Sequence, residues 1–467
     1  MSEPSAARGE NQLGCAPVGK LLLSFSVPSI ISCLVNSVYN IVDQIFIGQG
    51  IGYLGNAATT VSFPLMTMII AFATMLGSGG SAYAAIKLGE KREKEAEITL
   101  NSLFTVSLVT GLVLAAVGLI FLEPLLRLFG GTPEIMPYAK DYAAIVLLGT
   151  PFSLVGVLLS SMARTDGNPR LSMYGILIGA LLNTILDPIY IFIFHWGVKG
   201  AAIATITSQI LSACVLFHYF WKRGNMRLRR QLLKPVGRVV KTAVLLGTSS
   251  GITQSVACVM QVVMNNSLVF YGDQSPVGGN VALSAMGIVM KIAMILGSVC
   301  IGIGVGSQPI FGFNYGAGQL HRVRRTFALA IASATASVAL GWLVCQTMPH
   351  LILRLFGGGD AQFTAFAVKC LRIYLFGIFC AGFQVVSTNY FQATGQPLKA
   401  AILSSLRQLV LLIPLLLLLP LFWGLDGILF AGPVADMGSA VIVALFVIPE
   451  MRRLNRQIDE ADALASV

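Results

Sequence analysis

Long apolar runs separated by short polar segments repeat along almost the whole chain. A helix that spans the hydrocarbon core of a bilayer needs about 20 mostly apolar residues. The runs cover residues 21–47, 56–86, 98–122, 142–163, 171–194, 200–221, 242–270, 281–312, 326–349, 364–392, 400–422 and 427–449. The segments between them are too short for a soluble domain. The pattern therefore predicts an all-α integral membrane protein with twelve transmembrane helices.

Composition supports a membrane protein. Hydrophobic residues make up 55% of the chain and charged residues only 11%, whereas a soluble domain carries about 25% charged residues. A soluble globular protein is therefore excluded. The first 20 residues are polar and lead into a run long enough to span, so we expect no cleaved signal peptide.

Basic residues are distributed unevenly between the loops. The formal net charge is +11, but most lysines and arginines fall in loops on one side of the predicted helices, with the densest group at 222–241. Basic loops mark the cytoplasmic side. We expect a multi-pass plasma-membrane (bacterial inner membrane) protein with both termini in the cytoplasm and no nucleic-acid partner. The basic block is interpreted as a topology signal and linker, and binding of lipid or a partner is the alternative.

Three sequence landmarks recur at an offset of about 227 residues. The pairs are Leu125–Gly131 with Ile352–Gly358, Thr165–Pro169 with Thr394–Pro397, and Trp196–Gly200 with Trp423–Gly427. Six helices per repeat give two halves of the same orientation, related by an axis along the membrane normal, as in many transporters. A substrate would bind between the halves, with access alternating between the two sides of the membrane.

The repeat defines the predicted organisation of the chain. It consists of a cytoplasmic tail 1–20, an N-lobe 21–221, a basic cytoplasmic linker 222–241, a C-lobe 242–449 and a cytoplasmic tail 450–467. Glycines recur in the second helix of each half, at Gly77, Gly79, Gly80, Gly302, Gly304 and Gly306. Small residues let membrane helices approach closely. A hinge is the alternative role for these positions.

Apart from Lys369 and Arg372 near the outer end of run 364–392, five charged residues lie within the apolar runs: Asp43, Asp187, Lys291, Arg407 and Asp436. A charge at the bilayer centre costs roughly 2.5–3.5 kcal/mol on insertion scales, so each is a functional candidate. We interpret Lys291, Arg407 and Asp436 as structural buried charges, in which either basic residue pairs with Asp436 or with backbone carbonyls.

The two acids of the first half belong to polar helix faces. In the first helix, Asn36, Tyr39, Asn40 and Asp43 fall at i, i+3, i+4 and i+7 and share one face. In the fifth helix, Asn183 and Asp187 form an i, i+4 pair followed by Pro188, and the sixth helix adds the hydroxyl of Thr205. Pro28 and Pro188 each leave a backbone carbonyl unpaired, so both positions are expected to bend their helices.

This polar set suits a coupling ion. Two neighbouring carboxylates removed from water share protons as one unit, and carboxylate, amide and hydroxyl oxygens also suit a hard cation such as Na⁺. The residues alone leave H⁺ and Na⁺ open. The equivalent positions in the second half carry no acid, because residues 410–414 are apolar and the seventh helix has only the amides of Asn265 and Asn266. The ionisable site is therefore expected on one side only. A structural hydrogen-bond network without a transport role is the alternative.

Polar and methionine side chains on other helices are candidates for a substrate cavity. They are Asn36, Asn40, Gln254, Gln261, Asn265, Met286, Met290 and Met294. Flexible thioethers suit promiscuous binding, although methionine stripes are also common in helix cores. The eight cysteines show no C-x-x-C spacing, so neither a disulfide nor a metal is expected. No resident cofactor is expected either.

Together these residues resemble the multidrug and toxic compound extrusion (MATE) family, most closely its MepA-like bacterial branch, from about Lys20 to Pro449. The resemblance rests on four features of the sequence. They are the segment from Pro28 to Asp43 followed by Gln44–Gly48, the Asn183/Asp187/Pro188 group, the Thr205 region and the internal repeat. The resemblance implies a V-shaped pair of six-helix bundles that exports organic cations in exchange for H⁺ or Na⁺.

The resemblance also implies roles for particular residues. The family's N-lobe ion site corresponds to Tyr39, Asp43, Asn183, Asp187 and Thr205, and its bending proline corresponds to Pro28. This sequence lacks acids in 242–270 and 364–392, where another branch places a C-lobe site.

The function expected from the sequence is a secondary antiporter, not an enzyme. It would export cationic or amphipathic drugs and toxins, with antibiotic resistance as a consequence, and work as a monomer in the lipid bilayer. The alternative is a lipid-linked precursor flippase, whose anionic cargo would favour a basic cavity. A channel ranks lower because of the repeated two-lobe plan and the one-sided ionisable site. An intramembrane enzyme ranks lower because the chain contains no H-E-x-x-H motif.

Overall fold

The computed structural model describes residues 12–129, 131–355 and 361–465. Most of the expected N-terminal tail, Gly130 of the first repeat landmark and Phe356–Gly358 of its counterpart lie outside this range. Within it, twelve helical spans are long and apolar enough to cross a membrane. The prediction of an all-α fold with twelve transmembrane helices is confirmed.

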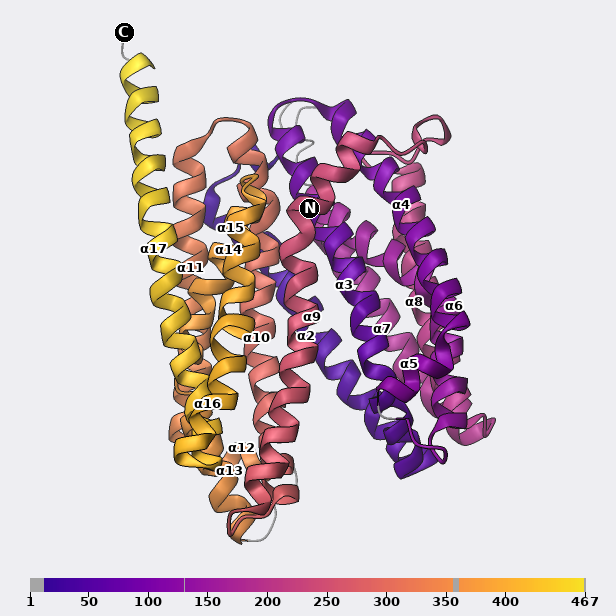
Figure 1. Ribbon diagram of the computed structural model, residues 1–467. Helices are drawn as coiled ribbons and strands as arrows, with labels where there is room; N and C mark the ends of the chain where they lie inside the picture. Colours follow the sequence, from indigo (N-terminus) through magenta and orange to yellow (C-terminus); the bar gives the residue numbers. More distant parts are fainter. Residues whose placement is uncertain (1–11, 130, 356–360, 466–467) are drawn as a thin grey trace, which may run out of the picture.

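The first six spans form the N-lobe and the last six form the C-lobe (Figure 1). The N-lobe spans are α2 (Val18–Ile51), α3 (Tyr53–Gly89), α4 (Glu93–Ile120), α6 (Met136–Thr165), α7 (Pro169–Pro188) with the π-helix η1 (Ile189–Ile193), and α8 (Gly197–Lys222). The C-lobe spans are α9 (Gly237–Asp273), α10 (Gly279–Gly316), α11 (Leu320–Thr347), α13 (Ala361–Tyr374) with η3 (Ile378–Cys380) and α14 (Ala381–Ala393), α15 (Pro397–Ser405) with the π-helix η4 (Leu406–Leu412) and α16 (Ile413–Trp423), and α17 (Leu425–Ala465). Short elements are α1 (Gln12–Cys15), α5 (Leu122–Leu128), η2 (Arg230–Leu232) and α12 (Pro349–Leu355).

The two lobes pack their first two spans in the same way. α2 packs on α10 of the other lobe, and its counterpart α9 packs on α3. Each lobe also carries a π-helical segment in its fifth span, with η1 at the end of that span and η4 in its middle, before α16. The pseudo-symmetry expected from the sequence landmarks is therefore present in the packing.

Helix α2 changes lobe along its length. Near its start, Leu21 and Phe25 belong to the same buried cluster as Phe311 and Tyr390 of the C-lobe. Near its end, Ile47 packs in a cluster of N-lobe residues. A movement of one lobe against the other must therefore bend or tilt α2.

The lobes meet tightly at the side of the molecule where α2 begins and α17 ends, which we call the terminal side. A Cβ built on Gly79 of α3 would lie 2.0 Å from the carbonyl oxygen of Ala243, and one on Gly247 of α9 would lie 1.8 Å from that of Met75. On α10, Gly306 lies against the backbone of α2 and Gly316 against Ile86 of α3. The close helix approach predicted at Gly79 and Gly306 is confirmed by these contacts.

A buried polar network also joins the lobes on the terminal side. Ser78 of α3 donates to Ser250 of α9 (2.7 Å), and the amide of Gln392 on α14 donates to Ser78 (3.0 Å) and to the carbonyl oxygen of Leu246 (2.9 Å). The amide of Gln308 donates to the carbonyl oxygen of Ser78. Towards the opposite side the lobes diverge (Figure 1). The structure is thus closed on the terminal side.

The basic linker is held against the N-lobe. The carboxylate of Asp166, in the turn between α6 and α7, accepts hydrogen bonds from the Tyr219 hydroxyl (2.7 Å) and from the backbone N–H groups of Asn225 (3.0 Å) and Met226 (2.8 Å). Asn101 of α4 bonds the backbone at Arg229. Because these contacts satisfy backbone groups between two spans, the first part of the linker is an ordered extension of the N-lobe.

Replacement of Asp166 with alanine is expected to destabilise the protein, because three donors lose their acceptor. Of the three donors only Met226 is buried, and a buried donor left unsatisfied costs about 1–3 kcal/mol, so the thermal unfolding midpoint in detergent should fall by a few degrees. The exposed Asp459 provides the control, and Asp459→Ala should leave the midpoint unchanged. Equal midpoints for both variants would contradict an anchoring role for Asp166.

Candidate functional site

Two acids from different helices meet inside the N-lobe. Asp43 of α2 and Asp187 of α7 are buried, with exposed fractions of 8% and 0%. Their carboxyl groups lie within hydrogen-bonding reach of each other. The contact requires α2 to lie along α7, so it joins residues more than 140 positions apart in the chain.

Two neutral polar side chains complete the contact. The amide nitrogen of Asn183 lies 3.4 Å from Asp187 Oδ1 and 3.4 Å from the hydroxyl oxygen of Thr205 on α8. Thr205 donates to the carbonyl oxygen of Ala201 (3.1 Å). The hydroxyl oxygen is thereby left facing Asn183 as an acceptor. Asn183 thus bridges an acid and a hydroxyl on neighbouring helices.

Several oxygens of this cluster have no partner in the protein. Among the described residues, one carboxylate oxygen of Asp43, one of Asp187 and the carbonyl oxygen of Asn183 are buried without a hydrogen bond. Leaving buried polar atoms unpaired costs about 1–3 kcal/mol each. Three such atoms in one cluster indicate a place where a proton, a cation or water completes the coordination.

Tyrosines close the cluster on two sides. Tyr39 lies one helical turn before Asp43 and near both acids. Tyr142 of α6 is buried beside Tyr39, Asp43 and Asp187, and the sequence analysis did not single it out. No local pattern marks it, because α6 carries neither an acid nor an amide on the helix face that Tyr142 shares. Only the packing of α6 against the cluster identifies it.

The backbone around Asp187 is irregular, as its proline suggests. Pro188 ends the α-helical part of α7, and the π-helix η1 follows at once. A π-turn widens the backbone ladder and is frequent at functional sites. Pro28, by contrast, is buried within the continuous helix α2.

The polar face of the first helix divides between two environments. Tyr39 and Asp43 face the N-lobe cluster, whereas Asn36 and Asn40 are exposed, with the Asn40 amide 2.6 Å from the Asn36 carbonyl oxygen. Asn40 also lines a cavity of about 660 Å³ between α2 and α10, together with Gln44, Gln49, Lys291 and Met294. α2 thus links the acid cluster to the space between the lobes.

This interlobe cavity lies directly beyond the closed part of the interface. Ser37 of α2 and Ser298 of α10 are joined by a hydrogen bond of 2.7 Å. One helical turn further from the terminal side, Asn40 and Met294 line the cavity. The cavity therefore opens to the side opposite the termini.

Other predicted cavity residues lie elsewhere. Met286 is 1% exposed and packs in the C-lobe core, with Met290 against that core, so the prediction that Met286 faces a cavity is wrong. The three methionines share one face of α10, but that face meets the C-lobe core at Met286 and Met290 and the cavity at Met294. Gln254, Gln261 and Asn265 are half-buried on α9, where Gln261 donates to Asn265 (2.9 Å).

The charges of the C-lobe are only partly as expected. Arg407 on η4 forms a salt bridge with the buried Asp436 on α17, which confirms one of the two pairings considered. Lys291 is exposed and lines the interlobe cavity. The prediction of a buried structural charge at Lys291 is therefore wrong, because α10 turns this residue toward α2 rather than toward Asp436.

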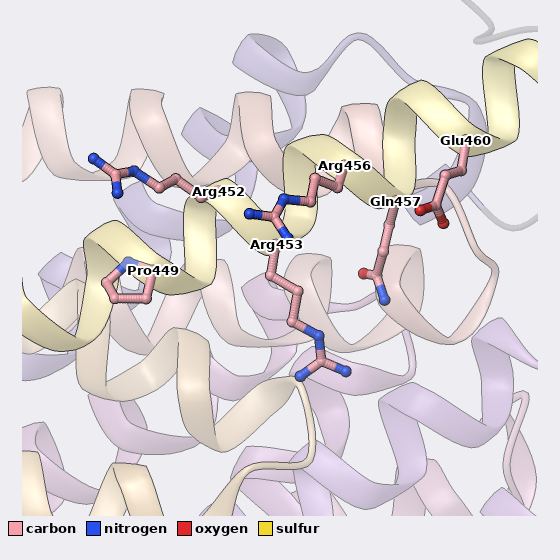
Figure 2. A pocket seen from close by; sticks show the side chains of 6 residues that line it. All are labelled: Pro449, Arg452, Arg453, Arg456, Gln457 and Glu460. Atoms are coloured by element: carbon pink, nitrogen blue, oxygen red, sulfur yellow. The ribbon is translucent and has the colours of Figure 1, made fainter.

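A second hollow lies on the surface at the terminal side, far along α17. It has a volume of about 370 Å³ and is lined by Arg452, Arg453 and Arg456 with Pro449, Gln457 and Glu460 (Figure 2). All its lining residues come from one helix, and it contains no part of the acid cluster. It does not contribute to the site described above.

Comparison with known proteins agrees with this architecture. The MatE family model matches residues 28–189 and 245–418. The chain belongs to the MatE family. Its relatives are named as multidrug export proteins and transporters. Family membership and the twelve hydrophobic spans of the described residues together identify the chain as a multi-pass membrane protein. The match covers α2 from Pro28, both acids of the N-lobe cluster and most of the C-lobe.

Individual relatives cover nearly the full chain. The multidrug export protein MepA of Staphylococcus haemolyticus is 27% identical over 451 residues, which are 95% of this chain and 96% of that protein. MepA of Staphylococcus aureus (strain MRSA252) is 25% identical over 92% of this chain and 94% of that protein. These matches confirm the resemblance to MepA-like MATE proteins.

Solved structures show the same fold. An outward-facing MATE family transporter of the MOP superfamily aligns with a TM-score of 0.89 and 22% identity over 95% of this chain and 98% of its own. The MATE multidrug transporter DinF-BH, solved as a complex with a small molecule, aligns with a TM-score of 0.85 and 32% identity over 94% and 98%.

Proposed function

We propose that this MATE transporter is a plasma-membrane antiporter that exports cationic or amphipathic organic compounds in exchange for H⁺ or Na⁺. The observation that carries the proposal is the buried pair Asp43 and Asp187, with carboxylate oxygens that lack protein partners. Relatives named as multidrug export proteins support the substrate class.

In the proposed cycle, the coupling ion binds Asp43 and Asp187, with Asn183, Thr205 and Tyr39 around them. The ion neutralises the pair, which removes the negative charge that attracts an organic cation. Release of the ion restores that charge, so ion and substrate exclude each other. A ligand shifts a conformational equilibrium only through its different affinity for the two states, and the link runs through α2, because its two halves pack in different lobes.

The proposed orientation places both termini in the cytoplasm, because the basic linker and the arginines of α17 lie on the terminal side. The closed terminal side then makes this an outward-open state, in which the interlobe cavity faces the exterior. Ion entry from outside would be expected in this state.

Reconstituted protein tests the proposal. Export of a fluorescent organic cation should follow either a pH gradient or a Na⁺ gradient, each imposed alone, and the gradient that drives export identifies the coupling ion. Export under neither gradient by a correctly inserted protein would contradict antiport.

Competition between ion and substrate is expected at equilibrium as well. Binding of the cationic dye to the detergent-purified protein should release protons or be weakened by added Na⁺, because both ligands use the same carboxylates. Titration calorimetry in two buffers of different ionisation enthalpy detects the released protons, and a NaCl series tests the second case. Dye binding that is independent of both pH and Na⁺ would rule out direct competition.

A further inference from the structure

Within the part of the chain that the structure describes, Lys291 is a positive charge inside a membrane span without an acidic partner. It lies roughly 18 Å along α10 from Gly279, at 1.5 Å per residue, and within the span that begins at Val281. Arg407, another basic residue within an apolar run, is neutralised by Asp436. Among the described residues, Lys291 forms no ion pair. Intramembrane charges are costly and mark pathways for substrates or ions.

The surroundings of Lys291 suit an anionic group on an organic molecule. Across the cavity, α2 presents the amides of Asn40, Gln44 and Gln49, which can donate hydrogen bonds. Ile41, Ile45 and Met294 add apolar wall. An ammonium and several amide donors around an apolar surface match a carboxylate attached to a hydrophobic body, and they repel a cationic group placed at the same spot.

The same stretch of α2 also leads to the acid pair. Asp43 lies between the cavity residues Asn40 and Gln44, but its side chain is directed into the N-lobe, where it meets Asp187. Positive and negative groups therefore occupy the two sides of one helix. A molecule with a cationic end and an anionic end could be attracted by the acids and held by Lys291 at once.

We propose that Lys291 is a specificity-determining residue that binds the carboxylate of zwitterionic amphipathic substrates. This inference rests on the proposed export function and names the residue that distinguishes carboxylate-bearing from purely cationic substrates. Removal of the charge lowers affinity for carboxylates and leaves the affinity for simple cations unchanged or higher.

Two dyes that share one fluorophore distinguish cationic substrates from substrates that carry a carboxylate. Rhodamine 123 is a cationic methyl ester, and rhodamine 110 carries the free carboxyl group. Proteoliposomes of wild type, Lys291→Met and the charge-preserving Lys291→Arg are compared for export of both dyes. We expect Lys291→Met to raise the apparent KM for rhodamine 110 by about tenfold, as for loss of a charge-assisted hydrogen bond. Its rhodamine 123 export should not fall, and Lys291→Arg should retain export of both dyes.

Several outcomes would overturn the proposal. They are wild-type export of rhodamine 123 without rhodamine 110, an equal loss of both dyes in Lys291→Met, or an unchanged KM for rhodamine 110 in that variant. If wild type exports neither dye under any gradient, the antiport function itself fails. Fluorescence anisotropy of rhodamine 110 with the detergent-purified proteins then decides the role of Lys291: weaker binding to Lys291→Met supports it, and equal binding refutes it.

Discussion

Replacement of Asp43 with asparagine is expected to reduce gradient-driven dye export to the level of protein-free liposomes. Asparagine has nearly the same size as aspartate but carries no charge and binds no exchangeable proton on its side chain. The variant therefore mimics the ion-loaded site permanently. Without an ionisable group the ion and the substrate can no longer exclude each other, and exchange stops.

The matched control for this variant is Asp426→Asn. Asp426 pairs with Lys369 and is exposed, with 43% of its side chain accessible, so its replacement should leave export unchanged. Export is measured in proteoliposomes, with equal insertion checked by protein content and an unfolding midpoint within about 4 °C of wild type. Full export by well-inserted Asp43→Asn protein would refute a coupling role for Asp43.

Valine at Gly79 or Gly247 is expected to prevent the terminal side from closing and to stop transport. The new Cβ atoms would lie 2.0 Å and 1.8 Å from backbone carbonyl oxygens of the partner helix, well inside van der Waals contact. Backbone atoms cannot move aside as a flexible side chain can. The lobes must therefore separate at this side, and the outward-open state loses population.

Spin labels detect this separation directly. With labels at the exposed positions Lys94 of α4 and Arg325 of α11 in a cysteine-free background, electron paramagnetic resonance should show a longer distance in Gly247→Val than in wild type. The control is Gly287→Val, because Gly287 has no atom within 4 Å of an added Cβ. Wild-type distances together with normal export in Gly247→Val would show that the tight glycine contact is dispensable.

Local sequence patterns were sufficient to predict the membrane spans, the internal repeat and the shared helix face of Asn183 and Asp187. Hydrophobic length decides whether a helix can cross a bilayer, and this property belongs to each segment separately. Asn183 and Asp187 fall on one face through the i, i+4 spacing alone. The helix bounds were less accurate, because α17 continues to Ala465, beyond the apolar run that ends at 449.

The meeting of Asp43 with Asp187 followed from the family resemblance and could not follow from spacing. Periodicity places each acid on a face of its own helix, but it contains no information on which neighbour that face meets. For the same reason the four polar residues of the first helix were interpreted as one face. In the structure Asn40 lines the interlobe cavity while Asp43 lies in the N-lobe.

The sequence by itself determined that the chain is a membrane protein of two six-helix repeats with acids in the first repeat, since apolar length, internal similarity and residue type are local properties. Only the tertiary structure decided that Tyr142 lies beside the acids, that α2 crosses from one lobe to the other, and that Lys291 faces a cavity while Arg407 pairs with Asp436. These features depend on contacts between segments distant in the chain. Such contacts are set by the packing of whole helices, and small residues such as Gly79 and Gly247 determine how closely those helices approach.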